Sequence, residues 1–271
     1  MNETLKRSLS GLVYVLLLIF CTLYSEDSFV ILIGIFLFFT AKEYCTINKL
    51  QVTIPTLFCL LVYFVFAYLI DFTKINFLNI LLLFIALGIS IQLLFWLFSK
   101  KIKIFSSAYL YFILIAYILL SFIYLIKLPI VKNQFNPNII ISIFILIWTH
   151  DTFAYIVGKS IGKTKLLVHI SPKKTIEGFF GGLFFSILLS VVISNFYNVP
   201  YSTIFWIIAA ILISFLGTIG DLVESKFKRI AKVKDSGNIM PGHGGMLDRL
   251  DSVIFVSPFM YLLFKISSYV S

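Results

Sequence analysis

The sequence predicts an all-α protein that crosses a membrane many times. Of its 271 residues, 60% are hydrophobic and only 13% are charged, and the mean hydropathy is +1.04. Soluble domains are about 45–50% apolar and about 25% charged. Apolar runs long enough to span a bilayer as helices recur along the whole chain, and no soluble domain fits between them.

Nine apolar segments are predicted to span the membrane, since a bilayer requires about 20 apolar residues per helix. The second segment is the shortest. Two polar connections are long, at 159–175 and 222–250. The predicted spans are 9–24, 28–41, 52–70, 75–98, 104–126, 138–158, 176–196, 201–221 and 251–270.

The basic residues predict the orientation. Eighteen of the 22 Lys and Arg residues fall on the side of the N-terminus, three fall on the opposite side and Lys265 lies in the last span. Lys and Arg concentrate in cytoplasmic loops. The N-terminus and both long connections are therefore predicted to be cytoplasmic, and the C-terminus to lie outside. The net charge of +10 then reflects contact with anionic headgroups, so no nucleic-acid partner is expected.

The acidic residues single out the C-terminal half. Asp151 and Asp221 lie within or at the edge of apolar runs, where an unpaired carboxylate costs several kcal/mol and is by default functional. We predict a catalytic part at 136–271 with a polar cavity open to the cytoplasm, and a scaffold at 1–135. Seven of the twelve acids lie between 151 and 251: Asp151, Glu177, Asp221, Glu224, Asp235, Asp248 and Asp251.

The stretch TIGDLVESKFKR places four polar side chains on one helical face. Asp221, Glu224, Ser225 and Lys228 follow the spacing i, i+3, i+4, i+7. Carboxylates beside Lys and Arg are the mixture that binds Mg²⁺ together with a polyphosphate. The alternative is a charged loop solvated at the membrane surface.

Glycine-rich PGHGG, at 241–245, argues against a merely solvated loop. Successive amides in such a turn can form an anion-binding nest. In SPKKTIEGFFGG, Lys173 and Lys174 precede a helix N-terminus, which also favours anions. The glycines after them indicate close helix packing, and His150 is interpreted as a packing residue. The sequence contains no GxxxxGK[ST] loop and no arrangement for a covalent nucleophile.

The stretch SKFKRIAKVKDSGNIMPGHGGMLDRLD resembles the hallmark of the phosphatidate cytidylyltransferases, or CDP-diacylglycerol synthases. DTFAYIVGKSIGKTKL and SPKKTIEGFFGG are also similar to blocks of that family, and the resemblance covers about 148–255. Lys232 and Phe153 depart from the common pattern without removing a charge. The matching hallmark residues are Ser225, Lys228, Arg229, Lys234, Asp235, Pro241, Gly242, His243, Gly244, Gly245, Asp248, Arg249 and Asp251.

The resemblance implies that CTP and phosphatidate react to give CDP-diacylglycerol and pyrophosphate. It implies Mg²⁺ held by Asp221 and Asp248, and a monovalent cation such as K⁺ is a further candidate. The other predicted catalytic residues are Lys228, Arg229, His243 and Arg249, with His243 as an organiser rather than a base. The predicted substrate-binding residues are Ser171, Lys173, Lys174, Ser225, Lys234, Asp235, Gly242, Gly244, Gly245, Asp251 and Asp151.

We expect membrane lipid and a second copy of the chain as partners, and a bacterial-type inner membrane as the location. Two other functions stay open at this point. A CTP-dependent polyprenol or phytol kinase would use a similar cavity but transfer the γ-phosphoryl group. A cation-coupled transporter would use the intramembrane acids as a relay, although its site would lie nearer the midplane.

Overall fold

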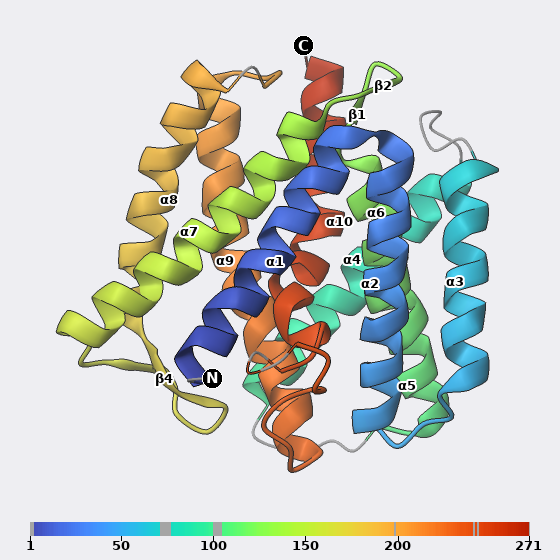
Figure 1. Ribbon diagram of the computed structural model, residues 1–271, viewed down its shortest axis with the longest axis vertical. Coiled ribbons are helices and arrows are strands. Elements are labelled where there is room, and N and C mark those ends of the chain that lie inside the picture. Colours follow the sequence, from blue (N-terminus) through green and yellow to red (C-terminus); the bar gives the residue numbers. More distant parts are fainter. Residues whose placement is uncertain are drawn as a thin grey trace.

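The computed structural model describes residues 3–70, 77–99, 105–197, 199–240, 242 and 244–270. The described chain is a bundle of long helices with two short β-hairpins (Figure 1). In order, its elements are α1 (Glu3–Tyr24), α2 (Glu26–Ile47), α3 (Thr53–Tyr68), α4 (Phe77–Phe98), α5 (Ser107–Ile113), the π-helical η1 (Leu114–Leu119), α6 (Leu120–Lys127), β1 (Ile130–Val131), β2 (Gln134–Phe135), α7 (Pro137–Ile161), β3 (Lys165–Leu167), β4 (Ser171–Thr175), α8 (Ile176–Phe196), α9 (Thr203–Ile230) and α10 (Leu247–Val270).

The helices confirm an all-α polytopic membrane protein. Among the described residues, seven helices are long and apolar enough to cross a membrane. Shorter apolar helices at Leu9–Tyr24 and Thr53–Tyr68 fall at the first and third predicted spans. The first turn of α1 and the last turn of α10 lie at opposite ends of the bundle (Figure 1). The count of nine spans, the orientation and the division at residue 135 stay predictions.

Three predicted boundaries are wrong. α9 continues to Ile230 and α10 begins at Leu247, so the polar connection is 231–246 and not 222–250. α9 continues because its polar face pairs internally: Ser225 Oγ donates to Asp221 Oδ1, and Lys228 pairs with Glu224. α2 likewise extends past residue 41 to Ile47. The other predicted connection, 159–175, begins with the end of α7 and contains the β3–β4 hairpin.

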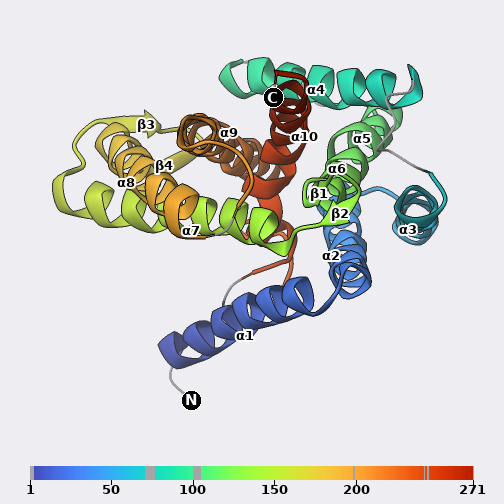
Figure 2. The ribbon, with the colours of Figure 1, turned by 90° about the horizontal axis from the view of Figure 1, so that it is seen from above.

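α10 occupies the centre of the bundle (Figure 2). It contacts α9, α6, α4, α2 and α7. Seen from above, α7, α8 and α9 form a group on one side of it and α2, α5 and α6 a group on the other, while α1 and α4 lie on opposite flanks. Residues of the α10 N-terminus can therefore be reached from both halves of the chain.

A buried lysine fastens α4 to α9. Lys226 on α9 is 8% exposed, and its ammonium donates to the carbonyls of Trp96, Leu97 (3.2 Å) and Ser99 (3.0 Å) at the end of α4. Helix C-terminal carbonyls lack intrahelical donors and carry partial negative charge. The cation therefore satisfies the end of α4 inside the bundle.

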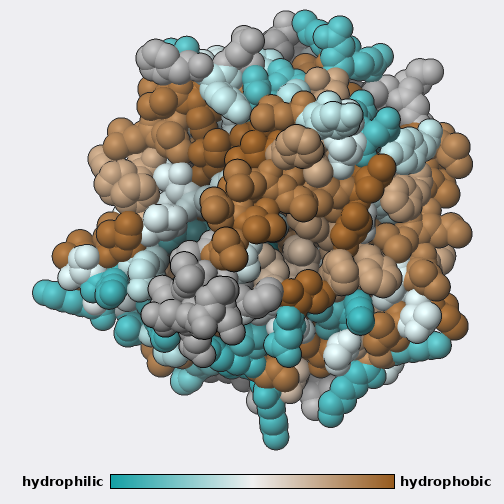
Figure 3. Space-filling view, viewed as in Figure 1, coloured by the Kyte–Doolittle hydropathy of each residue, from teal (hydrophilic) through white to brown (hydrophobic). Residues whose placement is uncertain are grey.

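Apolar side chains cover the outer faces of the flanking helices. In Figure 3, hydrophobic residues form a broad band across the molecule, and hydrophilic residues gather towards its two ends. Phe20 on α1, Phe95 on α4 and Phe184 on α8 are 58–72% exposed. Such a surface is stable against lipid rather than water.

Glycines bring α7 and α8 into close contact, as the sequence indicated. A Cβ atom at Gly181 would lie 2.6 Å from Val157 Cγ2, and one at Gly182 would lie 2.6 Å from the carbonyl oxygen of His150. Real Cβ atoms do not approach backbone this closely. The two helices therefore depend on these glycines for their present separation.

We expect Gly182→Ala to destabilise the protein by about 1–3 kcal/mol, because the added methyl group overpacks a backbone contact. Gly88→Ala is the matched control, since nothing lies within 4 Å of a Cβ atom at Gly88 on α4. Thermal unfolding in detergent measures both. Equal unfolding temperatures for the two variants would contradict the close α7–α8 contact.

Candidate active site

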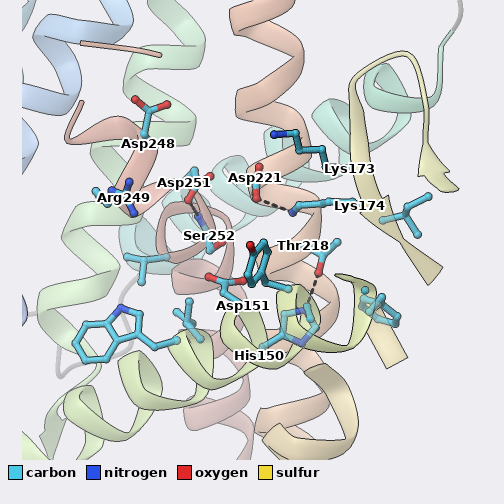
Figure 4. A pocket seen from close by; sticks show the side chains of 18 of the residues that line it. His150, Asp151, Lys173, Lys174, Thr218, Asp221, Asp248, Arg249, Asp251 and Ser252 are labelled. Atoms are coloured by element: carbon cyan, nitrogen blue, oxygen red, sulfur yellow. Dashed lines mark hydrogen bonds and ion pairs between the residues drawn. The ribbon is translucent and has the colours of Figure 1, made fainter. Parts of the chain in front are cut away.

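A cavity of about 950 Å³ lies between α1, α7, the β3–β4 hairpin, α9 and the start of α10. One part of its wall is apolar and is formed by α1 and α7. The rest is strongly polar (Figure 4). The polar lining residues are His150, Asp151, Lys159, Lys165, Lys173, Lys174, Thr218, Asp221, Asp248, Arg249, Asp251 and Ser252.

Asp221 of α9 forms an ion pair with Lys174 of β4. Lys174 Nζ lies 2.6 Å from Asp221 Oδ2, and Ser225 Oγ donates to Asp221 Oδ1 over 3.2 Å. Desolvation by burial would lower the pKa of Lys174, but the neighbouring carboxylates, Asp221 above all, raise it above its ordinary value. Lys174 is therefore charged throughout the physiological pH range and holds the hairpin against α9.

Two further carboxylates face the same space. Asp151 comes from α7 and Asp251 from α10, and both lie around the Asp221–Lys174 pair in Figure 4. Asp251 Oδ1 accepts the backbone N–H of Ser252 over 2.7 Å. Three helices thus each direct an aspartate into one cavity. Such a concentration of negative charge needs cations to be stable.

Asp248 lies in the first turn of α10, and both of its carboxylate oxygens have donors. Oδ2 accepts Ser236 N–H (2.8 Å), Ser236 Oγ–H (2.9 Å) and Gly245 N–H (2.8 Å). Oδ1 lies 2.5 Å from Lys228 Nζ. Gly244 has φ +82°, and a Cβ atom there would lie 2.6 Å from Asp248 Oδ2. The glycine is therefore required for the loop to approach the carboxylate.

Lys228 bridges two acids just outside the cavity lining. Its ammonium lies 2.5 Å from Glu224 Oε2 and 2.5 Å from Asp248 Oδ1, and its side chain is 11% exposed. The predicted helical face of α9 is therefore present, with the ion pair at i, i+4. In this arrangement Lys228 neutralises carboxylates and contacts the cavity only through Asp248.

Other predicted residues lie elsewhere. Arg229 Nε donates to the carbonyl of Ile170 over 3.4 Å and so ties α9 to the hairpin, which ends at Ser171–Thr175. Lys234, Asp235 and Gly242 are exposed in the connection before α10 and do not line the cavity. The predicted organiser His243 lies outside the described residues, as does Pro241. Roles for all of these residues in substrate binding stay predictions.

Several site residues were missed from the sequence. Lys159, Lys165, Thr218 and Tyr14 line the cavity. Thr218 Oγ1 lies 3.0 Å from Nε2 of buried His150, which agrees with the packing role inferred for that histidine. Lys159 and Lys165 lie within the stretch DTFAYIVGKSIGKTKL, and Thr218 begins TIGDLVESKFKR, but neither stretch shows which of its side chains face the cavity. That depends on how α1, α7, α9 and the β3–β4 hairpin pack together.

Glu43 was not predicted as a site residue, although its position in the sequence indicates one. It is an acid at the end of the second apolar run, in a half of the chain that was interpreted as scaffold. The structure buries it to 5% exposure against the α10 N-terminus. The rule that buried acids in a membrane protein are functional by default would have identified it.

The oxygen ligands fit a metal that arrives with its substrate. Among the described residues, no three His, Cys, Asp or Glu side chains converge closely enough to hold a metal ion by themselves. Mg²⁺ usually takes only one or two protein carboxylates and completes its shell with phosphate oxygens and water. Asp221 and Asp248 both line the cavity, and their role as such a set stays a prediction.

Comparison with known proteins gives a consistent result. Residues 5–267 match the sequence profile described as the Cytidylyltransferase family. The chain is 46% identical over 136 residues to the phosphatidate cytidylyltransferase of Bacillus subtilis (strain 168), covering 50% of this chain and 51% of that protein. It is 42% identical over 173 residues to the protein of that name from Staphylococcus epidermidis, and 41% over 175 residues to that from Staphylococcus aureus (strain COL). Both alignments cover 64% of this chain and 65% of the relative. The chain therefore spans about half to two thirds of the length of these relatives.

We expect Lys228→Met to destabilise the protein by about 3–5 kcal/mol, because it leaves Glu224 and Asp248 buried without their cation. Lys234→Met, at an exposed position, is the control and should change stability by less than about 0.5 kcal/mol. Chemical or thermal unfolding in detergent gives the difference. Adding Glu224→Gln to Lys228→Met should restore part of the loss. Strictly additive effects of the two substitutions would show that the pair does not interact.

Proposed function

The chain belongs to the cytidylyltransferase family, and we propose that it transfers the cytidylyl group of CTP to phosphatidate, giving CDP-diacylglycerol and pyrophosphate. One observation carries the proposal. A single cavity joins a wall of lysines and carboxylates to an apolar wall between two helices. The names of the relatives favour this reaction over phosphoryl transfer to a polyprenol.

The polar end of the cavity suits a triphosphate. Lys165, Lys173 and Lys174 of the hairpin and Arg249 of α10 place four cations around it. Point-charge lysines and a forked guanidinium are the usual ligands of phosphate groups. In this proposal the hairpin lysines contact the nucleotide, and Lys174 exchanges part of its interaction with Asp221 for phosphate oxygens.

The apolar end suits a lipid. Gly11, Tyr14 and Val15 of α1 line it together with Phe144, Ile147 and Trp148 of α7. Three of these side chains form an aromatic group: the Trp148 ring centroid lies 5.6 Å from that of Phe144 and 6.5 Å from that of Tyr14. We place the glycerol and first acyl carbons of phosphatidate here, with the tails in the bilayer.

The reaction needs no general base in this site. A phosphate monoester has a second pKa near 6, so the phosphatidate oxygen is mostly ionised at pH 7. That oxygen forms a bond to the α-phosphorus of CTP as the bond from the α-phosphorus to the bridging oxygen of the β-phosphate breaks. Pyrophosphate leaves with the electron pair. The contribution of the protein is positioning and the neutralisation of charge.

Each charged group has a place in this step. Asp221 and Asp248 would hold Mg²⁺, which supplies charge neutralisation between the phosphates when bound, and K⁺ is a further candidate at the same carboxylates. Arg249 would orient the attacking phosphate. Asp151 and Asp251 add to the effect of Asp221 in raising the pKa of Lys174 and so help to keep it charged.

We further propose that the cavity faces the cytoplasm of a bacterial-type inner membrane. The β3–β4 hairpin and the connection before α10 lie at the same end of the bundle as the N-terminus (Figure 1). This is the end to which the basic residues were assigned by the positive-inside rule. CTP would then enter from the cytoplasm. A homodimer built through the lipid-facing helices remains part of the proposal.

The proposed reaction predicts that label from [α-³²P]CTP enters lipid when the protein is mixed with phosphatidate and Mg²⁺. Asp221→Asn and Asp248→Asn should each lower the rate by at least about 100-fold, because each removes a carboxylate that would hold Mg²⁺ and so weakens the neutralisation of charge in the transition state. Glu26→Gln, an exposed acid at the far end of α2, is the control and should leave it unchanged. Label that stays out of lipid, with transfer instead from γ-labelled CTP to a polyprenol, would overturn the assignment.

The proposed lipid wall predicts a separate effect on one substrate. Trp148→Ala should raise the KM for phosphatidate, expressed as mole fraction in mixed micelles, by about tenfold, or about 1.4 kcal/mol. The KM for CTP should stay the same. Phe95→Ala removes an aromatic ring from the lipid-facing side of α4 and should change neither constant. A rise in the KM for CTP without a rise in the KM for phosphatidate would contradict the placement of the lipid against Trp148.

A further inference from the structure

Glu43, a buried glutamate on α2 in the N-terminal half, accepts hydrogen bonds from the backbone just before Asp248. Glu43 Oε1 accepts the N–H of Met246 over 3.0 Å, and Oε2 accepts the N–H of Leu247 over 2.8 Å. Ser236 Oγ also lies 2.9 Å from Oε2, and its single hydrogen is shared between this oxygen and Asp248 Oδ2. The glutamate therefore supplies, from α2, the acceptor that the first amides of α10 lack.

The loop is shaped to receive this carboxylate. A Cβ atom at Gly237 would lie 2.5 Å from Glu43 Oε1, and one at Gly245 would lie 2.5 Å from Glu43 Cδ. Glycines at both positions let the backbone close around the side chain. The Lys174 and Lys228 ion pairs involve other carboxylates, so donors from the loop and the positive end of α10 interact with the Glu43 carboxylate.

The same loop atoms determine where Asp248 points. Ser236 places its hydroxyl between Glu43 Oε2 and Asp248 Oδ2, and its backbone N–H donates to Asp248. Gly245, which packs on Glu43, donates its own N–H to Asp248. Glu43 does not line the cavity. It reaches the reacting groups only through this loop.

We propose that Glu43 is a positioning residue that holds Ser236 and residues 245–247 in the arrangement that presents Asp248 to the cavity. The proposal rests on the proposed function for its effect on rate, but not for its effect on metal binding. The N-terminal half of the chain then determines part of the geometry of the site, in addition to its role as a membrane scaffold. Loss of Glu43 should weaken the cation site while leaving the lipid wall unchanged.

Glu43→Gln tests the proposal with little change of shape. The amide replaces one acceptor oxygen by a donor that faces other donors, so at least one loop contact is lost. We expect the Mg²⁺ concentration for half-maximal transfer to rise by about tenfold, with the KM for phosphatidate unchanged. Glu43→Asp keeps a carboxylate at shorter reach and should recover part of the loss. Thr40→Val is the matched control: Thr40 is buried one turn earlier on α2, and its hydroxyl has no hydrogen-bond partner among the described residues.

A second readout needs no turnover. Mn²⁺ binding in the presence of CTP and without phosphatidate, followed by electron paramagnetic resonance, should weaken by about tenfold in Glu43→Gln and stay normal in Thr40→Val. If Glu43→Gln does not fold, Ser236→Ala, which removes the hydroxyl between the two carboxylates, should weaken Mn²⁺ binding by severalfold. Folded Glu43→Gln protein with normal Mn²⁺ binding and normal Mg²⁺ dependence would overturn the proposal.

The two proposals can fail separately. Unsubstituted protein that binds Mn²⁺ and CTP, but forms no labelled lipid, would refute the proposed reaction and leave the Glu43 effect on Mn²⁺ binding as its own test. Protein that labels lipid, and whose Glu43→Gln variant has lower kcat but unchanged metal affinity, would refute positioning of Asp248. A lower kcat with unchanged metal affinity is what a smaller fraction of folded protein would give, so this result would assign Glu43 a structural role only.

Discussion

The structure depends on neutralising several carboxylates at one end of an apolar helical bundle. Asp221 is paired with Lys174 and Asp248 with Lys228, each at 2.5–2.6 Å. A buried charge that loses its partner costs several kcal/mol, so these pairs restrain every element that supplies one. The β3–β4 hairpin folds back to deliver Lys174, α9 continues past the apolar run to deliver Lys228, and the loop before α10 needs glycine to approach Asp248.

The same constraint provides the proposed chemistry. In the proposed reaction Lys174, which neutralises Asp221 in the protein alone, becomes available to phosphate groups when substrates arrive, and Asp221 then becomes available to a divalent cation. Tyr14, Phe144 and Trp148 of α1 and α7 form the apolar side of the cavity, which in the proposed reaction receives the lipid substrate. Charge and apolar surface in one cavity thus let a water-soluble and a lipid substrate meet.

Much of this could be predicted from the sequence, because membrane spans and charged motifs are local signals. Apolar runs in the sequence predicted where the helices lie. The residues predicted for the site include Asp151, Lys174, Asp221, Asp248 and Asp251, and these side chains do line the cavity. Helix ends were missed because internal pairing, as between Glu224 and Lys228, prolongs a helix beyond its apolar part. Tyr14 was missed because its role depends on which distant helices pack together, which no local pattern encodes. Glu43, an acid at the end of an apolar run, did carry a local signal, but the partner that it holds on α10 could not be predicted from that signal.

If both substrates occupy one cavity and react directly, no enzyme-bound nucleotidyl intermediate forms. The stereochemistry at phosphorus tests it. With CTP carrying a chiral α-phosphorothioate and phosphatidate as acceptor, one in-line displacement predicts inversion of configuration at the α-phosphorus in the lipid product. Retention would require two displacements, and hence a covalent intermediate on the protein, and would contradict the account.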